Sequence, residues 1–469
     1  MTRIDKVAFK VSGIVLFYFF VLLAFLSCSS DEGAAVDISN EEENTINPID
    51  TSIDGLPLFS INTNGATIVD EPKINADASV SMDGSVDFSG KIGIEIRGSS
   101  SQPFPKKSYG FERWDDSSQD VDASILGFPE EEDWILYGPF SDKSLMRNVL
   151  IYDLSSDMKQ YASRTKFVEL NLNGTYRGVY VFMEKLKRDK ERIDIAKLNE
   201  DENTGEDLTG GYVIKIDKND NGGFTSQNSF VSQFGSSLRE PSTEVRILFE
   251  YPKPEDLTSE RRDYITTYVN DVESALASDT YMDPVNGYDQ YIDVDSFVDY
   301  FILNELSNNV DGYRISTFMH KNKNEKLKMG PLCDFNLGFG YADYCSGGAT
   351  DVWAYQFNER CPDDFYQVPF WWSRLMEDPA FVSRLQSRCN ELRGNILSEG
   401  NIFAKVDSYI DVLDKTESID KNFQTWNVLG TYVWPNSFVG ETYNQEIDFL
   451  KSWISDRLNG MDTTITGLL

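Results

Sequence analysis

Residues 328–340 read KMGPLCDFNLGFG and place a single acid, Asp334, in a stretch that otherwise resembles a buried strand turning through glycines. A carboxylate in such apolar surroundings costs several kcal/mol unless a cation or hydrogen-bond donors meet it. Two interpretations are open: Asp334 caps a turn, or it holds a metal ion. The choice between them depends on the rest of the chain.

The composition excludes several classes of protein. The 469 residues suit two or three domains or one large two-lobed one, and 40% hydrophobic residues provide a sizeable core. A net charge of −34 argues against nucleic-acid binding, because phosphate binding needs a basic surface. His320 is the single histidine, and the five cysteines show no CxxC spacing. Any catalysis must therefore use carboxylates, lysine and arginine, with or without a bound cation.

The first 28 residues have the pattern of a lipoprotein signal peptide. A short basic region precedes an apolar run that ends in FLSC, which resembles a lipobox with Cys28 as the lipidated residue. A plain secretory signal or a membrane anchor is the alternative. Residues 29–55 are acidic and predict a flexible tether, resembling surface-export signals of Bacteroidetes lipoproteins. We expect an exported protein, held on the bacterial outer membrane by its lipid alone, with the cell surface as a further destination.

Two lobes follow from the patterning. Residues 56–218 predict a sheet-rich N-terminal lobe: residues 91–113 alternate as strand, loop and strand, and Asn173-Gly174 marks a hairpin. One helix is predicted there, with its N-cap at Ser141 or Asp142. Residues 219–469 predict a mainly helical C-terminal lobe with one hairpin at residues 322–324. The expected fold class is α+β, and the expected oligomeric state is a monomer.

The predicted hairpin lies between two acids in the sequence and should bring them to the same edge in the fold. Asp311 follows a helix that ends near Asn308, and Asp334 lies beyond the hairpin, 23 residues later in the sequence. Protein kinases place a catalytic-loop acid, a hairpin and a metal-binding acid in this order. One carboxylate orients the attacking hydroxyl, and the other holds Mg²⁺ against the phosphates of ATP.

Residues 97–112, RGSSSQPFPKKSYGFE, offer what a triphosphate needs from a protein. Small residues let backbone N–H groups approach phosphate, and Arg97, Lys106 and Lys107 supply positive charge. The alternative is an ordinary hairpin loop with solvated lysines.

These blocks together resemble the CotH kinase family. The resemblance runs from about Leu56 to Asp462, and its carriers include IRGSSSQPFPKKSY, ELNLNGTYRGVYVFMEKLKRDKERIDI, NELSNNVDGYRISTF and LKMGPLCDFNLGFG. It implies an atypical protein-kinase-like, two-lobed fold that uses ATP and Mg²⁺ to phosphorylate Ser or Thr hydroxyls of proteins. It further implies that Asp311 is the catalytic acid, that Asp334 is a metal ligand, and that Lys107 meets the phosphates with Arg97 nearby.

Four further positions are assigned with alternatives. Arg147 is a partner in the cleft or forms an ion pair on a helix surface, and Glu184 pairs with a lysine, contacts nucleotide or is a surface acid at a strand edge. The family commonly has Asn five residues after the catalytic acid as a second metal ligand, where this chain has Ser316. A hydroxyl ligates Mg²⁺ more weakly, so we expect a second metal that is loosely held or absent, and activity that needs high Mg²⁺ or prefers Mn²⁺. Cys333 replaces the usual aromatic residue before the metal acid and is expected to pack as a small hydrophobe.

Two other functions remain open from the sequence. A kinase-fold surface module for adhesion or ligand capture, without catalysis, fits an exported location where ATP is scarce. A glycosidase with paired carboxylates fits the acidic, aromatic-rich composition, although no motif indicates it. In an oxidising compartment, Cys345 and Cys361 either close a Gly-rich loop as a disulfide or remain buried thiols.

Overall fold

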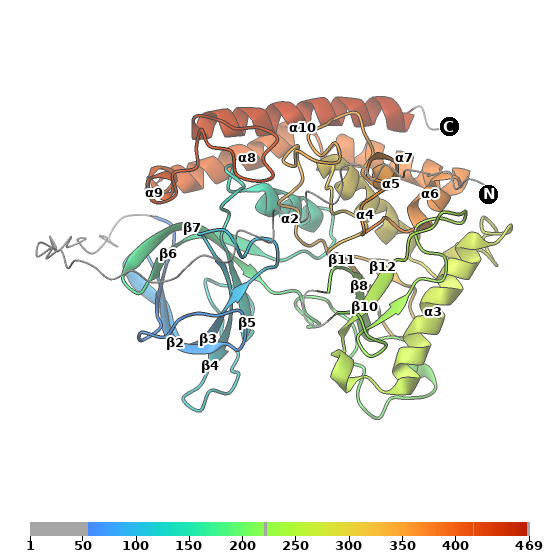
Figure 1. The fold of residues 1–469 in the computed structure, drawn as a ribbon, viewed down its shortest axis with the longest axis horizontal. Coiled ribbons are helices and arrows are strands. Elements are labelled where there is room, and N and C mark those ends of the chain that lie inside the picture. Colours follow the sequence, from blue (N-terminus) through green and yellow to red (C-terminus); the bar gives the residue numbers. More distant parts are fainter. Residues whose placement is uncertain (1–54, 220–222, 416, 467–469) are drawn as a thin grey trace, which may run out of the picture. The chain divides into compact units, whose positions relative to one another are not determined.

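The structure, a computed structural model, describes residues 55–219, 223–415 and 417–466. The predicted signal peptide, Cys28 and all but the last residue of the predicted tether lie outside these residues. Figure 1 shows a barrel of strands, a second sheet and a set of helices.

A closed barrel forms the first part of the described chain. Its strands are ordered β1-β2-β3-β4-β5-β7-β6, and parallel pairing of β1 with β6 closes it. Aromatic side chains fill the interior: Phe182 lies 5.0 Å from Trp134 and 5.1 Å from Phe59, ring centre to ring centre. The strands are β1 (Leu58–Asn62), β2 (Ile74–Met82), β3 (Ser85–Arg97), β4 (Ser108–Trp114), β5 (Asp133–Tyr137), β6 (Thr165–Leu172) and β7 (Thr175–Glu184).

Both hairpins predicted in this part are confirmed. Strands β3 and β4 pair antiparallel, with Arg97 opposite Ser108 at the mouth of the connecting loop. Strands β6 and β7 pair around Asn173 and Gly174, whose φ angles of 54° and 77° are the left-handed values that an Asn-Gly turn supplies. The barrel therefore presents the loop of residues 98–107 and its cations at one end of β3 and β4.

A five-stranded sheet lies beside the barrel and was not predicted as a sheet. Its order is β12-β11-β8-β10-β9, and its pairings are antiparallel. The hairpin at residues 322–324 is confirmed as β11 and β12, but β11 also pairs with β8, which the sequence assigned to the other lobe. The expectation of a lone hairpin in the second lobe is thus wrong. The strands are β8 (Tyr212–Ile216), β9 (Ser229–Val231), β10 (Arg246–Tyr251), β11 (Thr317–Lys321) and β12 (Lys328–Met329).

Most of the helices lie in the later part of the described chain, as expected. The predicted N-cap of the first is wrong: α2 begins at Arg147, its N-cap position is Met146, and neither Ser141 nor Asp142 occupies it. Asp142 instead accepts the Arg147 N–H from five residues upstream. The helices are α2 (Arg147–Asp157), α3 (Ser259–Ala277), α4 (Val294–Ser307), α5 (Phe357–Arg360), α6 (Trp371–Met376), α7 (Pro379–Arg393), α8 (Glu399–Asp414), α9 (Ser418–Thr425) and α10 (Tyr443–Thr466).

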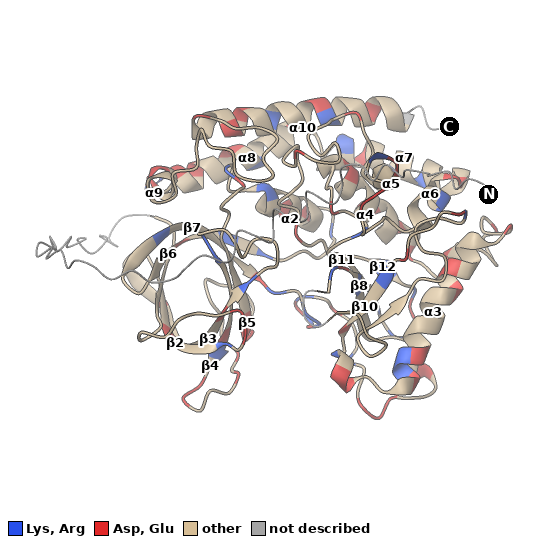
Figure 2. Cartoon of the chain, in the orientation of Figure 1, with Lys and Arg blue, Asp and Glu red and all other residues tan. Residues whose placement is uncertain are grey.

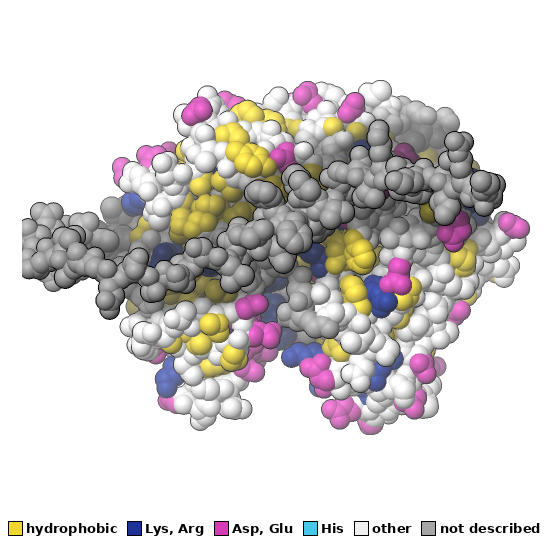
Figure 3. Space-filling view, viewed as in Figure 1, with side chains coloured by type: hydrophobic (Ala, Val, Ile, Leu, Met, Phe, Trp, Pro, Cys, Tyr) yellow, Lys and Arg dark blue, Asp and Glu magenta, His cyan; other side chains and the backbone are white. Residues whose placement is uncertain are grey.

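The fold is therefore mixed α and β, with antiparallel sheet early and helices late, in agreement with the expected α+β class. Figure 3 shows acidic side chains spread over one face of the described residues, as the net charge of −34 requires. No helix within the described residues is both long and apolar enough to cross a bilayer.

Candidate active site

The loop after α4 is held in one conformation by buried polar contacts. Asn308 ends the helix with a left-handed φ of 43°, and its side-chain amide donates to the carbonyls of Ser346, Gly347 and Ala349. An Asn side chain tolerates this backbone and can bond locally, which explains its use here. The catalytic-loop candidate is thereby fastened to the Gly-rich loop that follows Cys345.

Tyr313 adds a second anchor. It is fully buried with a φ of 70°, an unfavourable backbone for a bulky residue. Its hydroxyl donates to Glu305 of α4 at 2.9 Å, and its ring lies 4.5 Å from that of Trp372. Glu305 also accepts the N–H groups of Ala354 and Tyr355. A strained loop residue fixed by several contacts is typical of a functional site.

Asp311 lies in this loop and is 9% exposed. The Arg314 guanidinium donates to its Oδ1 at 3.0 Å. Burial raises the pKa of Asp311 above its usual range, and the charge of Arg314 opposes that rise. Asp311 is therefore a mostly buried carboxyl with one charged donor, and its pKa lies above the usual range.

Asp334 lies after β12 and is tied to α2 through its backbone. Its N–H donates to the Tyr152 hydroxyl at 3.0 Å, and the next N–H, of Phe335, donates to Asn148 at 2.8 Å. Its φ is 56°, so the backbone turns sharply here. These contacts use the backbone N–H groups of Asp334 and Phe335 and do not involve the Asp334 carboxyl. Cys333 packs against a small apolar cluster that contains Phe318 and Val213, as expected.

The Asp334 carboxyl is exposed to solvent, and none of the described residues donates a hydrogen bond to it. Surrounding protein atoms nevertheless displace enough water, and Asp311 adds enough negative charge, to raise the pKa of Asp334 to about 6. Arg97 opposes the rise. The two acids that the sequence paired are therefore close enough to affect each other, and Arg97 reaches them from the barrel.

Asp217, which follows β8, joins this group and was missed by the sequence analysis. Its negative charge raises the pKa values of both Asp311 and Asp334, while that of Lys218 lowers them. An acid directly after the buried strand YVIKI was the available signal. We call Asp217, Asp311 and Asp334 the loop acids.

Ser316 lies near the loop acids through its backbone. Its N–H donates to Asp217 Oδ1 at 3.2 Å, and its φ of 48° is left-handed. The residue thus lies next to Asp217, an acid that the sequence analysis did not identify.

Lys106 and Lys107 point away from the loop acids. Lys106 is 2% exposed and donates to Asn422 of α9 at 2.8 Å, and burial lowers its pKa well below the usual value. Lys107 donates to the carbonyl of Gln102 within its own loop. Neither side chain contacts Asp311 or Asp334, so Arg97 is the one predicted cation that the structure brings to these acids.

Arg147 and Glu184 are buried in ion pairs. Arg147 binds Asp142 and Ser144, with its guanidinium 5.2 Å from the Tyr341 ring centre. Glu184 binds Arg164 and accepts from the Tyr161 hydroxyl at 3.1 Å. Both are 1% exposed, so neither is the surface residue that the alternative interpretations expected.

A second acidic group lies on the barrel. The carboxylates of Asp122, Glu131 and Glu132 come within 4.8 Å of one another, an arrangement that could hold a metal ion. However, Lys187 from the chain after β7 donates to Glu131 at 2.8 Å and to Glu132 at 2.6 Å. Figure 2 shows the basic residues of this segment between the barrel and the second sheet. We call Asp122, Glu131 and Glu132 the barrel acids. Lys187 provides the positive charge next to them.

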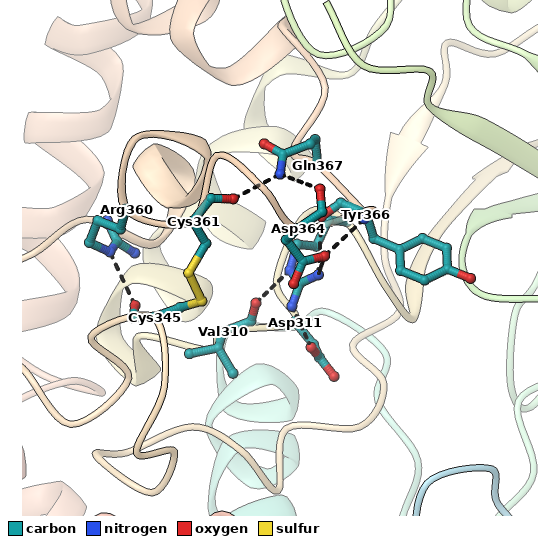
Figure 4. Close-up of a disulfide and its surroundings, with 9 residues drawn as sticks. Val310, Asp311, Cys345, Arg360, Cys361, Asp364, Tyr366 and Gln367 are labelled. Carbon is teal, nitrogen blue, oxygen red and sulfur yellow. Dashed lines mark hydrogen bonds and ion pairs between the residues drawn. A yellow bond between two sulfur atoms is a disulfide. The ribbon is translucent and has the colours of Figure 1, made fainter. Parts of the chain in front are cut away.

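The sequence left Cys345 and Cys361 open as a disulfide or two thiols, and the structure contains the disulfide. Its closed loop lies next to Asp311 (Figure 4).

A protein-family model named CotH kinase protein matches residues 94–461. This chain belongs to the CotH kinase family. The matched range includes β4 to most of α10 and contains every loop acid. A search of curated proteins found no significant match. Membership in the CotH kinase family indicates a kinase-like function with ATP and a divalent metal, and the acids at 311 and 334 are both present.

The loop acids fit a hard divalent cation. Asp334 has an exposed carboxyl to which none of the described residues donates a hydrogen bond, and the negative charges of Asp311 and Asp217 raise its pKa against the opposing charges of Arg97 and Lys218. This carboxyl is therefore available to a cation, and oxygen ligands are those that Mg²⁺ and Mn²⁺ prefer.

Proposed function

We propose that this protein is an exported atypical kinase of the CotH family, which transfers the γ-phosphate of ATP to Ser or Thr hydroxyls of a protein. The main support is the electrostatic proximity of Asp311 and Asp334 on either side of the β11–β12 hairpin. Asp311 is mostly buried and held by an arginine, whereas Asp334 is exposed and accepts no hydrogen bond on its carboxyl from the part of the chain that the structure describes. These two environments suit a proton acceptor and a metal ligand.

In the transfer, the acceptor hydroxyl loses its proton to the Asp311 carboxylate as its oxygen bonds to the γ-phosphorus. The bond between that phosphorus and the β,γ-bridging oxygen breaks, and ADP departs with the bonding electron pair. Arg97 lies near enough to Asp334 for its charge to lower the pKa of that acid, and it neutralises charge on the ATP phosphates. A divalent cation held by Asp334, with Ser316 as a weaker ligand, would supply further positive charge at the phosphate oxygens.

Export and lipid anchoring through Cys28 belong to the same proposal. The apolar run before Cys28 supports it, and the Cys345–Cys361 disulfide is a bond that oxidising compartments produce. The anchoring is tested by growing cells with labelled fatty acid. The full-length protein should be labelled and Cys28→Ala should not; a labelled Cys28→Ala form would refute lipidation at this residue.

A surface binding module without catalysis is the second candidate. It is favoured by the positions of Lys106 and Lys107, because neither lysine of the predicted phosphate loop contacts the loop acids. Such a module would keep the fold and a ligand site but transfer no phosphate.

The deciding experiment incubates the full-length protein with Mg²⁺ and ATP labelled in the γ-phosphate, then locates phosphoserine and phosphothreonine by mass spectrometry. Casein serves as a general acceptor, and the protein itself as a second one. The kinase proposal expects label that disappears in Asp311→Asn. Saturable nucleotide binding without any label on either acceptor, or label that persists in Asp311→Asn, would contradict it.

A further inference from the structure

Arg314 is almost fully enclosed, and all three nitrogens of its guanidinium are bonded. Nη2 donates to Asp311 at 3.0 Å, Nη1 donates to Asp364 at 3.1 Å and to the Tyr366 carbonyl at 3.1 Å, and Nε donates to the Val310 carbonyl at 2.7 Å. The guanidinium also lies 3.9 Å from the ring centre of Phe357. Figure 4 shows Val310, Asp311, Asp364 and Tyr366, four of these partners, close to one another beside the disulfide. A planar fork of donors fixed on several sides is a rigid support for a carboxylate.

Apart from Val310 and Asp311, the residues that contact Arg314 lie in one segment, residues 357–367, which begins with α5. Its conformation is set by the Cys361 carbonyl, which accepts from the Asp364 N–H at 3.1 Å and from the Gln367 side chain at 2.9 Å. Cys361 is in turn joined to Cys345 by the disulfide. Arg360 adds a parallel contact by donating to the Cys345 carbonyl at 3.2 Å.

The Cys345 side of the disulfide is connected to the catalytic loop as well. The Asn308 side-chain amide donates to the carbonyls of Ser346, Gly347 and Ala349, as described above. The disulfide therefore joins two loops, one that holds the start of the Asp311 loop and one that holds Arg314.

We propose that Arg314 is the positioning residue for Asp311, and that the Cys345–Cys361 disulfide braces the loop that holds Arg314. The proposal rests on the proposed kinase function for the role of Asp311, but the brace itself is independent of catalysis. Reduction of the bond would release residues 357–367, loosen the Arg314 fork and lower the rate of transfer.

Electrostatics provides a readout that a merely structural role would not move. The charge of Arg314 lowers the pKa of Asp311, and that of Asp364 raises it. Asp311 must be ionised to accept a proton, so activity is present above its pKa and lost as the pH falls through it. The charged and titratable groups that act on Asp311 are Arg314, Lys218, Asp217, Asp364, Asp334 and Tyr344.

The first test compares Arg314→Gln with Arg360→Gln in the full-length protein at saturating Mg²⁺. Arg360 is the control, because it is an arginine of the segment that contacts Arg314, donates to the carbonyls of Cys345 and Trp353, and does not touch Asp311. Arg314→Gln should lower kcat by about 10- to 100-fold, leave the KM for ATP nearly unchanged and move the acidic limb of the kcat profile to higher pH. Arg314→Lys should restore the limb but not the full rate, since one nitrogen cannot replace three.

A milder variant guards against misfolding of Arg314→Gln. Asp364→Asn keeps an acceptor for Arg314 but removes a negative charge, so its acidic limb should move to lower pH. Limbs that move in the same direction in Asp364→Asn and Arg314→Gln, or that do not move, would overturn the positioning role.

The disulfide is tested by the double variant Cys345→Ser/Cys361→Ser and by dithiothreitol, which supplies two electrons and two protons and is itself oxidised to a cyclic disulfide. Both treatments should lower kcat and speed amide hydrogen exchange in residues 309–316 and 357–367. The double variant should not respond further to dithiothreitol. Unchanged exchange after complete reduction would overturn the brace.

Hydrogen exchange also separates the two proposals. If the parent transfers no phosphate but reduction still loosens both segments, the proposed kinase function fails and the brace stands. If the parent is active and neither reduction nor Arg314→Gln changes kcat, the kinase function stands and the brace fails.

Discussion

The protein has two acidic groups that look alike by composition and differ in what neutralises them. The barrel acids and their neighbour Asp133 surround Lys187, which donates to Glu131, Glu132 and Asp133 at 2.6–3.1 Å. The loop acids are less tightly gathered, yet the Asp334 carboxyl has no donor among the described residues. In the tighter group, Lys187 donates to Glu131 and Glu132, whereas in the looser group none of the described residues donates to the Asp334 carboxyl.

Close spacing of carboxylates therefore does not by itself identify a metal site in this chain. A lysine placed inside an acidic group supplies the charge that an ion would bring, and it raises the chain's stability. An acid that lacks such a partner keeps its raised pKa and gains most from an added cation. We therefore expect the loop acids to govern activity and the barrel acids to govern stability.

The largest expected effect is on turnover. Asp311→Asn should reduce kcat by about 10²- to 10⁴-fold while ATP affinity changes little, as expected for a group that acts in the transition state. Glu132→Gln is the matched control from the barrel acids and should retain the parent kcat. Steady-state kinetics and nucleotide titration calorimetry measure both quantities. A parallel loss of ATP binding and rate in Asp311→Asn would indicate a structural or metal role instead.

The next effect concerns the metal. Mg²⁺ should raise the Tm of the parent and support nucleotide binding, and Asp334→Asn should lose both responses while remaining folded. Since the folded pKa of Asp334 is raised to about 6, ionising it costs stability, and the parent should lose stability as the pH rises from about 4 to 6. Without metal, Asp334→Asn should therefore melt higher than the parent above pH 6. Equal binding of Mg-ATP by the two proteins would exclude Asp334 as the main ligand.

Lys187→Met tests the barrel side of the comparison. It removes the lysine that Glu131, Glu132 and Asp133 share and should lower the free energy of unfolding by about 1–3 kcal/mol at neutral pH. The defect should shrink toward pH 4, because protonation removes the repulsion among the acids. Lys185→Met is the control, since Lys185 is more exposed and pairs with Asp133 alone. Added Ca²⁺ should stabilise Lys187→Met more than the parent; no gain would mean that the barrel acids cannot take a cation even when vacated.

Local features of the fold were predictable because neighbours in sequence decide them. The Asn173-Gly174 turn needs residues that accept left-handed backbone, and the apolar spacing of residues 294–307 suffices for α4. Barrel closure was not predictable, since the parallel pairing of β1 with β6 joins segments more than 100 residues apart. The same holds for β8, whose partners β10 and β11 come later in the chain.

The candidate site likewise has features that the sequence predicts and features that it does not. The order of acid, hairpin and acid can be read from the sequence, and the structure brings Asp311 and Asp334 together. The position of Lys106 cannot be read, because its partner Asn422 is 316 residues away. Arg314 and Asp364 were overlooked for a related reason: a charged residue in a loop reveals neither its burial nor its partner until distant segments pack.

The smallest expected effect lies at Ser316, where the family pattern and this chain differ. Ser316→Asn should lower the Mg²⁺ concentration needed for half-maximal activity severalfold, because an amide carbonyl is a stronger ligand than a hydroxyl. The parent should accordingly work better with Mn²⁺, whose geometric demands are looser. Initial rates over a series of Mg²⁺ and Mn²⁺ concentrations measure the change, with acceptor preference as the property that should stay constant.

The backbone makes this substitution a clean test. Residue 316 has a φ of 48°, which Asn tolerates better than most residues, and its N–H bond to Asp217 does not involve the side chain. Ser316→Asn should therefore fold like the parent, so that any change in metal dependence reports the new ligand. Ser316→Ala completes the series and should raise the Mg²⁺ requirement. If all three proteins show the same metal dependence, the side chain at 316 does not reach the ion, and Asp217 becomes the better candidate for its second ligand.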